Sequence, residues 1–351
     1  MKVLTVVGAR PQFVKAAPVS RAFSRSPTVD EFLVHTGQHH DLAMSEDQFR
    51  ALGLRAADIN LGIHGGAPSD ALGRMLQALD PVISDLAPRL LLVYGDTTST
   101  LAGALVAAGR NVPVVHVEAG LRSFDMSMPE ERNRVLVDRL SSLLFAPTST
   151  GVRNLGREGI TDGVELAGDV MLDAFLQTPH EPEPARRLLD SLGVGTEYVL
   201  ATLHRAETTS AARELATRID FVVEASEGRP VVLPLHPRTS AAAQRFGVDF
   251  GPIRLIDPVD YRAFGGLLAG CSLVLTDSGG VQKEAYFHRV PCITLRSETE
   301  WPETVEAGWN RLWTSPVWNE PRREISDYGT GDAAQRIVDS IVQHLGAQRH
   351  T

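Results

Sequence analysis

The chain has little cysteine, no long apolar run and no block of basic residues, and each absence excludes a class of protein. Its 351 residues include two cysteines, Cys271 and Cys292, which are too few for a disulfide framework or a zinc site, so we expect buried thiols. No apolar stretch approaches the roughly 20 residues that span a bilayer, which argues against a membrane partner. The 34 Lys and Arg against 43 Asp and Glu give a net charge of -9, so nucleic acid is not expected to bind.

What remains is the composition of a globular protein that is long enough for two domains. Hydrophobic residues make up 43% of the chain and charged residues 22%, which is typical of folded proteins. A domain usually takes roughly 150 residues, so two are expected. The apolar stretch Val3–Val7 is stopped by Arg10 and Pro11 before it could serve as a signal peptide, and we therefore expect a cytoplasmic protein.

Both halves of the chain alternate short β-branched runs with stretches of helical period, such as Thr97–Ala108 and Glu130–Leu140. This alternation predicts α/β architecture, with two similar doubly wound domains whose parallel sheets face each other across a cleft. Strands are predicted at Val3–Val7, Glu31–Thr36, Leu90–Tyr94, Pro113–Glu118 and Leu143–Pro147, and again at Tyr198–Leu203, Pro230–Leu235, Ile253–Ile256, Ser272–Thr276 and Pro291–Leu295.

A junction between the two domains is predicted where this alternation pauses. Gly168 leads into a segment that holds Pro179, Pro182 and Pro184, residues that interrupt regular structure. We therefore assign residues 1–170 to the first domain, 171–332 to the second, and 333–351 to a final helix that needs a surface to cover.

Three acidic residues are predicted at the ligand-binding edge of the first domain. Asp96 and Glu118 follow strands, and Glu130 opens a helix. Each alone could be a helix cap or a first-turn acid. Together they point to catalysis, because clustered carboxylates raise one another's pKa and can then supply a general base and a general acid near neutral pH.

Two turns are candidates for binding an anion. Gly8-Ala9-Arg10-Pro11 has a single glycine, which counts against NAD and ATP fingerprints, although Arg10 suits a phosphate. In the second domain, Thr276-Asp277-Ser278-Gly279-Gly280 ends a strand and opens a helix whose free amides could bind a diphosphate; the alternative is a plain helix cap. His204 and Arg205 follow another strand and resemble a phosphate grip, Glu284 could accept ribose hydroxyls, and Phe264 could stack on a base or belong to the core.

These motifs, in this order, resemble the non-hydrolysing UDP-N-acetylglucosamine 2-epimerase family over nearly the whole chain. The resemblance also covers Thr36-Gly37-Gln38-His39, the run from His116 to Ser123, Pro129-Glu130-Glu131 and Val305-Glu306-Ala307-Gly308. It implies the GT-B fold, a final helix that crosses back to the first domain, a homodimer, and inversion of C2 of a UDP-2-acetamido sugar through a glycal, without cofactor or metal.

The resemblance also implies roles for individual residues. Asp96, Glu118 and Glu130 would transfer protons, and His204 would assist the departure of UDP. The substrate would be bound by Arg10, Lys15, Gln38, His39, Arg205, His236, Phe264, Ser278, Gly279, Gly280, Lys283, Glu284 and Arg296. An activating second nucleotide sugar binds simple members beside the active site, partly at Gln38, His39 and Asp41, but residues 61–69 lack the basic group expected to hold its phosphates.

Some positions depart from the simple members and indicate a branch of the family. Gln12 and Lys283 replace glutamates, and Trp301 replaces an arginine. These changes favour the branch that acts on UDP-2,3-diacetamido-2,3-dideoxyglucuronate, whose carboxylate Lys283 or Arg296 could bind; UDP-N-acetylglucosamine is the alternative substrate. Two alternative functions from other classes of protein are a GT-B glycosyltransferase and a non-catalytic nucleotide-sugar sensor.

Overall fold

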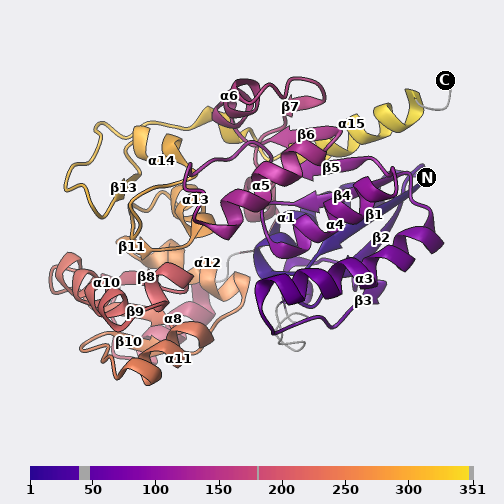
Figure 1. Ribbon diagram of the computed structural model, residues 1–351. Helices are drawn as coiled ribbons and strands as arrows, with labels where there is room; N and C mark the ends of the chain where they lie inside the picture. Colours follow the sequence, from indigo (N-terminus) through magenta and orange to yellow (C-terminus); the bar gives the residue numbers. More distant parts are fainter. Residues whose placement is uncertain (39–47, 180–181, 348–351) are drawn as a thin grey trace. The chain divides into compact units, whose positions relative to one another are not determined.

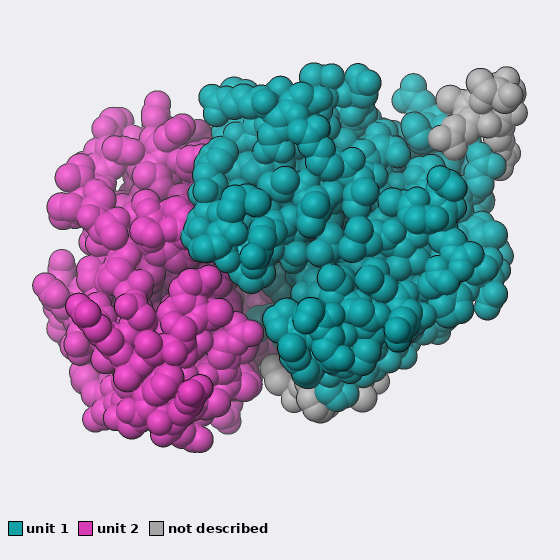
Figure 2. Space-filling view, in the orientation of Figure 1, with its two compact units in different colours: residues 1–177, 326–351 teal, residues 178–325 magenta. Residues whose placement is uncertain are grey.

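A computed structural model describes residues 1–38, 48–179 and 182–347 of the chain (Figure 1). It divides the chain into two compact units, which Figure 2 distinguishes by colour. Unit 1 comprises residues 1–177 and 326–351, and unit 2 comprises residues 178–325. Among the helices of the described ranges, none is both long and apolar enough to cross a membrane.

Unit 1 is built on a seven-stranded sheet of order β3-β2-β1-β4-β5-β6-β7 in which every pair is parallel. Helices between the strands cover the sheet, as parallel crossovers require. The strands are β1 Lys2–Val7, β2 Asp30–His35, β3 Ile59–Asn60, β4 Leu90–Tyr94, β5 Val114–Val117, β6 Leu143–Ala146 and β7 Val164–Leu166. The helices are α1 Arg10–Ser24, α3 Pro68–Leu86, α4 Thr98–Gly109, α5 Pro129–Leu140, α6 Ser149–Arg157, α7 Val170–Gln177, the 3-10 turn η1 Ser326–Tyr328 and α15 Ala333–Ala347.

Unit 2 repeats this plan with a six-stranded parallel sheet of order β10-β9-β8-β11-β12-β13. The strands are β8 Val199–Thr202, β9 Val231–Pro234, β10 Arg254–Ile256, β11 Leu273–Thr276, β12 Cys292–Thr294 and β13 Asn310–Leu312. The helices are α8 Pro182–Ser191, α9 Ala206–Thr209, α10 Ala212–Ala225, α11 Pro237–Phe246, α12 Tyr261–Gly270, α13 Gly279–Phe287 and α14 Pro302–Glu306.

All ten predicted strands are present, and both cysteines are buried free thiols. Strands β3, β7 and β13, which have two or three residues each, were not predicted. The units divide at 177 and 325, whereas the sequence-based boundaries were 170 and 332. The difference arises because α7 and η1 belong to unit 1: α7 packs on α1 and α15, and the backbone amide of Asp169 donates to the carbonyl of Tyr328 over 3.0 Å.

The order of the strands reverses at one position in each sheet, and the residues of interest follow the strands at that position. In unit 1 the reversal lies between β1 and β4, which precede Gly8 and Gly95; in unit 2 it lies between β8 and β11, which precede His204 and Asp277. Ligands of open α/β sheets bind beyond the carboxyl ends of the strands at such a switch point.

Candidate active site

Three acidic residues of unit 1 lie beyond the carboxyl ends of neighbouring strands. Asp96 follows β4, Glu118 follows β5, which pairs with β4, and Glu130 lies in the first turn of α5. Glu118 has a φ of +72, a left-handed conformation that costs a residue with a side chain of order 1–3 kcal/mol. Such strain persists only where the surrounding structure imposes it, so the conformation of Glu118 is set by its neighbours.

Glu118 forms a buried ion pair with Lys15 of α1. The Lys15 Nζ lies 2.6 Å from Glu118 Oε1, and the two side chains are 8% and 7% exposed. Gly95 lies against this pair: a Cβ at Gly95 would lie 3.0 Å from Lys15 Nζ and 3.8 Å from Glu118 Oε1. The φ of Gly95 is +60, so glycine suits this position for its conformation as well as its size.

Two side chains of helix α5 hold Asp96 in place. The guanidinium of Arg134 donates to a carboxylate oxygen of Asp96, and Asn133 Nδ2 donates to the Asp96 carbonyl over 2.8 Å. Arg134 also pairs with Glu131 at 2.5 Å. Glu131 in turn accepts from the backbone amide and hydroxyl of Ser123, at 2.9 and 3.0 Å. The helix that carries Glu130 therefore also fixes Asp96 and the loop after Glu118.

The first turn of α1 is organised by Gln12, where simple family members have a glutamate. Its Oε1 accepts from the amides of Gly8 and Ala9, at 2.8 and 3.1 Å, while its Nε2 donates to the Tyr94 carbonyl at 3.1 Å. A carboxylate could accept the first two bonds but could not donate the third. The amide thus joins the turn after β1 to the end of β4, and Arg10 begins the helix at this turn.

In unit 2, the buried Asp277 organises the turn after β8. Its carboxylate accepts from the backbone amides of His204 and Arg205, both at 2.9 Å, and from the hydroxyl of Thr208 at 2.8 Å. The His204 ring lies against Asp277 as well, with Nδ1 3.4 Å from Oδ1. The carboxylate therefore fixes the two residues that were predicted to assist a leaving phosphate.

The amino terminus of α13 has no side-chain cap. Ser278 occupies the cap position without a capping bond, and Asp277 is engaged with the β8 turn, so neither residue acts as the plain cap that was the alternative interpretation. The Arg205 guanidinium is close by, since a Cβ at Gly279 would lie 3.5 Å from its Nη2. Backbone amides at a helix amino terminus beside an arginine are a favourable setting for a phosphate.

The two basic residues expected to select the substrate are buried in unit 2. Lys283 is fully buried with its Nζ 3.7 Å from the centre of the Trp301 ring, so it does not point from the helix into water. Arg296 pairs with Glu300 at 3.0 Å and Glu298 at 3.2 Å. Burial lowers the pKa of Arg296, but the two carboxylates outweigh it and raise the pKa above its usual value.

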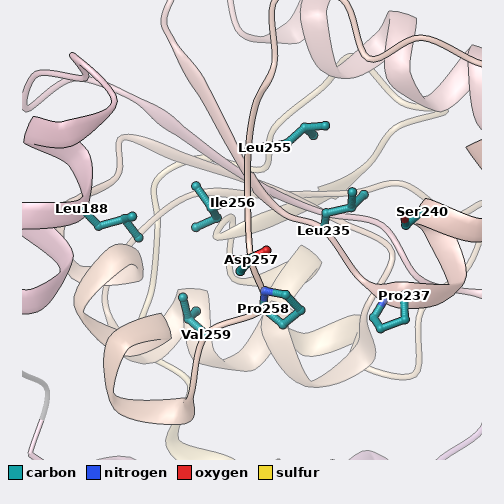
Figure 3. Close-up of a pocket in the computed structure, with 9 residues that line it drawn as sticks. All are labelled: Leu188, Leu235, Pro237, Ser240, Leu255, Ile256, Asp257, Pro258 and Val259. Carbon is teal, nitrogen blue, oxygen red and sulfur yellow. The ribbon is translucent and has the colours of Figure 1, made fainter.

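A pocket of about 620 Å³ opens beside the carboxyl ends of β9 and β10 (Figure 3). Its wall is mainly aliphatic, with Ser240 and Asp257 as polar members; the other lining residues are Leu188, Leu235, Pro237, Leu255, Ile256, Pro258 and Val259. Phe264 is not among them and packs in the hydrophobic core of the unit with Leu267 and Leu268. Stacking of a base on Phe264 remains a prediction.

The other predicted residues are placed as follows. Gln38 Oε1 accepts from the amide and hydroxyl of Ser99, at 3.1 and 2.7 Å. His236 caps α11, and its ring centre is 5.4 Å from that of His204. Glu284 is buried on α13. His39 and Asp41 lie outside the described residues, and within the described ranges no group of three or more His, Cys, Asp or Glu residues could hold a metal ion.

Comparisons with known proteins decide the family. The family model for UDP-N-acetylglucosamine 2-epimerase matches residues 21–342. A UDP-2,3-diacetamido-2,3-dideoxy-D-glucuronate 2-epimerase of Pseudomonas aeruginosa is 47% identical, over 98% of this chain and 100% of that protein. The crystal structure of the Methanocaldococcus jannaschii UDP-GlcNAc 2-epimerase in complex with UDP-GlcNAc and UDP is 38% identical, with a TM-score of 0.91 over 98% of this chain and 100% of that one.

The chain belongs to the UDP-N-acetylglucosamine 2-epimerase family. An Escherichia coli UDP-N-acetylglucosamine 2-epimerase is 32% identical over 97% of this chain and 98% of that protein. The predicted family is therefore confirmed, as are an isomerase class and the GT-B-like architecture of two Rossmann-like units with parallel sheets.

Several residues that shape the family site were not predicted from the sequence. Arg134, Asn133 and Glu131 hold Asp96 and its surroundings, and Asp277 holds the β8 turn. A signal for Arg134 exists, because it stands four residues after Glu130 and so shares a helix face with it. Asp277 belongs to a predicted turn motif, but the sequence offers no sign that its carboxylate holds the turn after β8.

Proposed function

We propose that this member of the family inverts C2 of a UDP-2-acetamido sugar by elimination and re-addition of UDP. The observation that carries the proposal is the group of three carboxylates at one edge of the unit 1 sheet, where Asp96 and Glu118 each contact a cation. Loss of the C2 proton to a base and cleavage of the C1–O bond, with the electron pair leaving on UDP, gives a glycal. Delivery of a proton to the opposite face of C2 and return of UDP to C1 complete the inversion.

In this proposal the two units have different tasks. Asp96, Glu118 and Glu130 share the proton transfers, and the paired cations Lys15 and Arg134 hold two of these carboxylates in place. In unit 2, His204 assists the departure of UDP, while Arg205, the Ser278 hydroxyl and the amides of Gly279 and Gly280 neutralise the diphosphate as its charge develops; the Ser278 amide itself donates to Thr276 Oγ1 over 2.9 Å. Arg10, at the amino terminus of α1, is a further phosphate ligand.

The nucleoside would be bound by unit 2 as well. Glu284, four residues after Gly280 on α13, is placed to accept bonds from ribose hydroxyls. For the uracil base, the pocket beside β9 and β10 is one candidate, because it is lined from the side of β8 on which the order is β10-β9-β8 and because ligand pockets are typically apolar with few polar groups. Stacking of the base on Phe264 is the other candidate.

As substrate we propose a UDP-2,3-diacetamido-2,3-dideoxyglucuronate, which would give the manno isomer for surface polysaccharide or related sugar biosynthesis. Support comes from the name of the Pseudomonas aeruginosa relative and from Lys283 at a position where simple members carry a glutamate. UDP-N-acetylglucosamine is the second candidate, because the Methanocaldococcus jannaschii relative was crystallised with it. A homodimer in the cytoplasm, with no cofactor, stays a prediction.

The experiment that tests the reaction uses deuterated water. The protein is incubated with each of the two UDP-sugars, and NMR follows the configuration and the hydrogen content at C2. Inversion with incorporation of solvent deuterium supports the proposal. A glycosyltransferase would leave C2 unchanged and need an acceptor, and a sensor would bind UDP-sugar without turnover, so either outcome would refute it. The ratio of kcat/KM for the two sugars then decides the substrate.

A further inference from the structure

A fully buried histidine, His116, connects the segments that carry the three acids of unit 1. It is the third residue of β5, two positions before Glu118. Its Nε2 lies 2.8 Å from the carbonyl of Gly95, the residue before Asp96, and its Nδ1 lies 2.7 Å from Oδ1 of Asp138 on α5. One side chain thus touches the loop after β4, the strand before Glu118, and the helix whose first turn holds Glu130.

Asp138 extends this connection to the loop after Glu118. Its Oδ2 accepts from the backbone amide of Gly120 at 3.2 Å and lies 2.8 Å from Nη1 of Arg122. Arg122 is itself held by Glu158 through two bonds of 2.6 and 2.9 Å. The carboxylate of Asp138 is buried, and its contacts with His116, the Gly120 amide and Arg122 fix its orientation.

The groups that face the His116 ring show where it carries a proton. The Gly95 carbonyl can only accept, so Nε2 of His116 carries a proton. Burial raises the pKa of the Asp138 carboxyl, but the hydrogen bond and charge of His116 and the charge of Arg122 outweigh burial and hold the pKa below its usual value. Nδ1 of His116 faces the Asp138 carboxylate, so the ring is hydrogen-bonded at both nitrogens and its orientation is fixed.

We infer that His116 and Asp138 are positioning residues that set the relative placement of Asp96, Glu118 and Glu130. This inference rests on the proposed function, since it concerns the same three acids. The strained φ of +72 at Glu118 supports it, because such a conformation needs neighbours that impose it, and Gly120, bonded to Asp138, is two residues away. The other interpretation is a buried hydrogen-bonded pair that serves stability alone.

The two interpretations differ in what the loss of the pair should do to catalysis. Misplacement of a catalytic group by about 1 Å can cost on the order of 100-fold in rate. A positioning pair should therefore affect kcat while the affinity for UDP, which is assigned to unit 2 and Arg10 and not to the pair, stays unchanged. A pair that serves only stability should lower the folded fraction and leave the kcat of the folded protein as it was.

The test uses graded variants in the full chain. His116→Asn keeps a donor near Asp138 and loses the bond to the Gly95 carbonyl. His116→Gln keeps a donor near the Gly95 carbonyl and loses the bond to Asp138. Asp138→Asn removes the charge that faces Arg122. Leu79→Ala, in the hydrophobic core of unit 1 on α3, is the matched control, because it creates a cavity without touching any acid. For each protein, kcat, the UDP dissociation constant by calorimetry, and the unfolding transition are measured.

We expect kcat of both His116 variants and of Asp138→Asn to fall about 10- to 100-fold, with UDP affinity within twofold of wild type, while Leu79→Ala loses stability and keeps its kcat per folded molecule. Variants at His116 that fold and keep kcat within threefold of wild type would overturn the inference. If Asp138→Asn fails to fold, the two His116 variants decide.

A second measurement does not depend on turnover. In ¹⁵N NMR of the wild type, Nε2 of His116 should carry a proton, as its bond to the Gly95 carbonyl requires, and an unprotonated Nε2 would overturn the arrangement of the pair. A wild type that binds UDP but exchanges no C2 hydrogen would refute the proposed function. An active wild type with fully active His116 variants would refute the positioning role and leave the proposed function intact.

Discussion

Replacement of Lys15 by methionine tests how the charge of Glu118 is balanced. The two side chains form a 2.6 Å ion pair and are 8% and 7% exposed, so Lys15→Met leaves a buried carboxylate without its cation. Removing one partner of a buried pair typically costs about 3–5 kcal/mol. We expect Lys15→Met to lower the free energy of unfolding of unit 1 by about 3 kcal/mol and to abolish most turnover.

The double variant Lys15→Met with Glu118→Gln separates charge from packing. It buries no charge, so it should recover most of the lost stability but none of the activity, because Glu118 is one of the proposed proton-transfer groups. Urea unfolding followed by circular dichroism measures both units. All four tryptophans, at positions 301, 309, 313 and 318, lie in unit 2, so fluorescence reports that unit as an internal control.

Additive stability losses of the two single variants would refute this reasoning. If the stability losses of Lys15→Met and Glu118→Gln simply sum in the double variant, the two charges are not coupled and the reasoning from burial fails. Contacting charged residues usually show interaction energies of about 0.5–3 kcal/mol in such a cycle, which urea unfolding can resolve.

Three further predictions follow from the site and from α15. Asp96→Asn and Glu130→Gln should each lower kcat about 100- to 10,000-fold while far-UV circular dichroism stays unchanged; near-normal rates would contradict the assignment. Asp173 accepts from the amides of Ala333 and Ala334 at the start of α15, and burial, its largest influence, raises its pKa from 3.8 to about 6. The folded state therefore binds the proton of Asp173 more tightly than the unfolded state, and this contributes up to about 3 kcal/mol of stability below pH 3.8, which is lost as the pH rises through about 6. Asp173→Asn should remove this part of the pH dependence of urea unfolding. Wild-type and variant stabilities that change in parallel with pH would contradict it. Turnover should not require UDP-N-acetylglucosamine as an activator, because residues 61–69 lack the basic group expected to hold its phosphates, and the nearby Arg74 donates to the carbonyls of His64 and Gly65. Sigmoidal kinetics abolished by that nucleotide sugar would contradict this prediction.

Most of the strands that the sequence predicted contain an apolar run that is buried on both faces; β10, an edge strand with two exposed residues, is an exception. The five residues of β4 are all buried, for example, and such a run is visible without any tertiary information. The strands that were missed lie at or near sheet edges. Ile59–Asn60 is a strand only because it pairs with Val34 and His35 of β2, and no local pattern of two residues can specify a partner.

The site shows the same division between local and tertiary information. The acids were predicted because each follows a strand or opens a helix, and a strand end is visible in the sequence. Their partners were not: Lys15 and Glu118 are separated by 103 residues, and the bond from Arg134 to Asp96 spans 38. Charged groups distant in sequence can be matched only once the fold brings them together.

Lys283 shows how burial changes the design of a test. Because simple members carry a glutamate at this position, exchanging Lys283 for glutamate is the obvious test of substrate preference for a side chain that faces the substrate. In the structure it is fully buried with its Nζ 3.7 Å from the Trp301 ring, so a glutamate there would bury a negative charge against the ring. Loss of activity in that variant would be explained by misfolding alone.

Lys283→Met avoids this difficulty, because it keeps the length of the side chain and removes only the charge. If Lys283 binds the carboxylate of a glucuronate-type sugar, the variant loses a charge-assisted bond worth roughly 1.5–3 kcal/mol, or about 10- to 150-fold in kcat/KM, for that sugar only. UDP-N-acetylglucosamine, which has no such carboxylate, serves as the control in the same protein preparation. A lysine that only packs on Trp301 would lower kcat/KM for both sugars by the same factor, so an unchanged ratio between them would contradict a role in selecting the substrate.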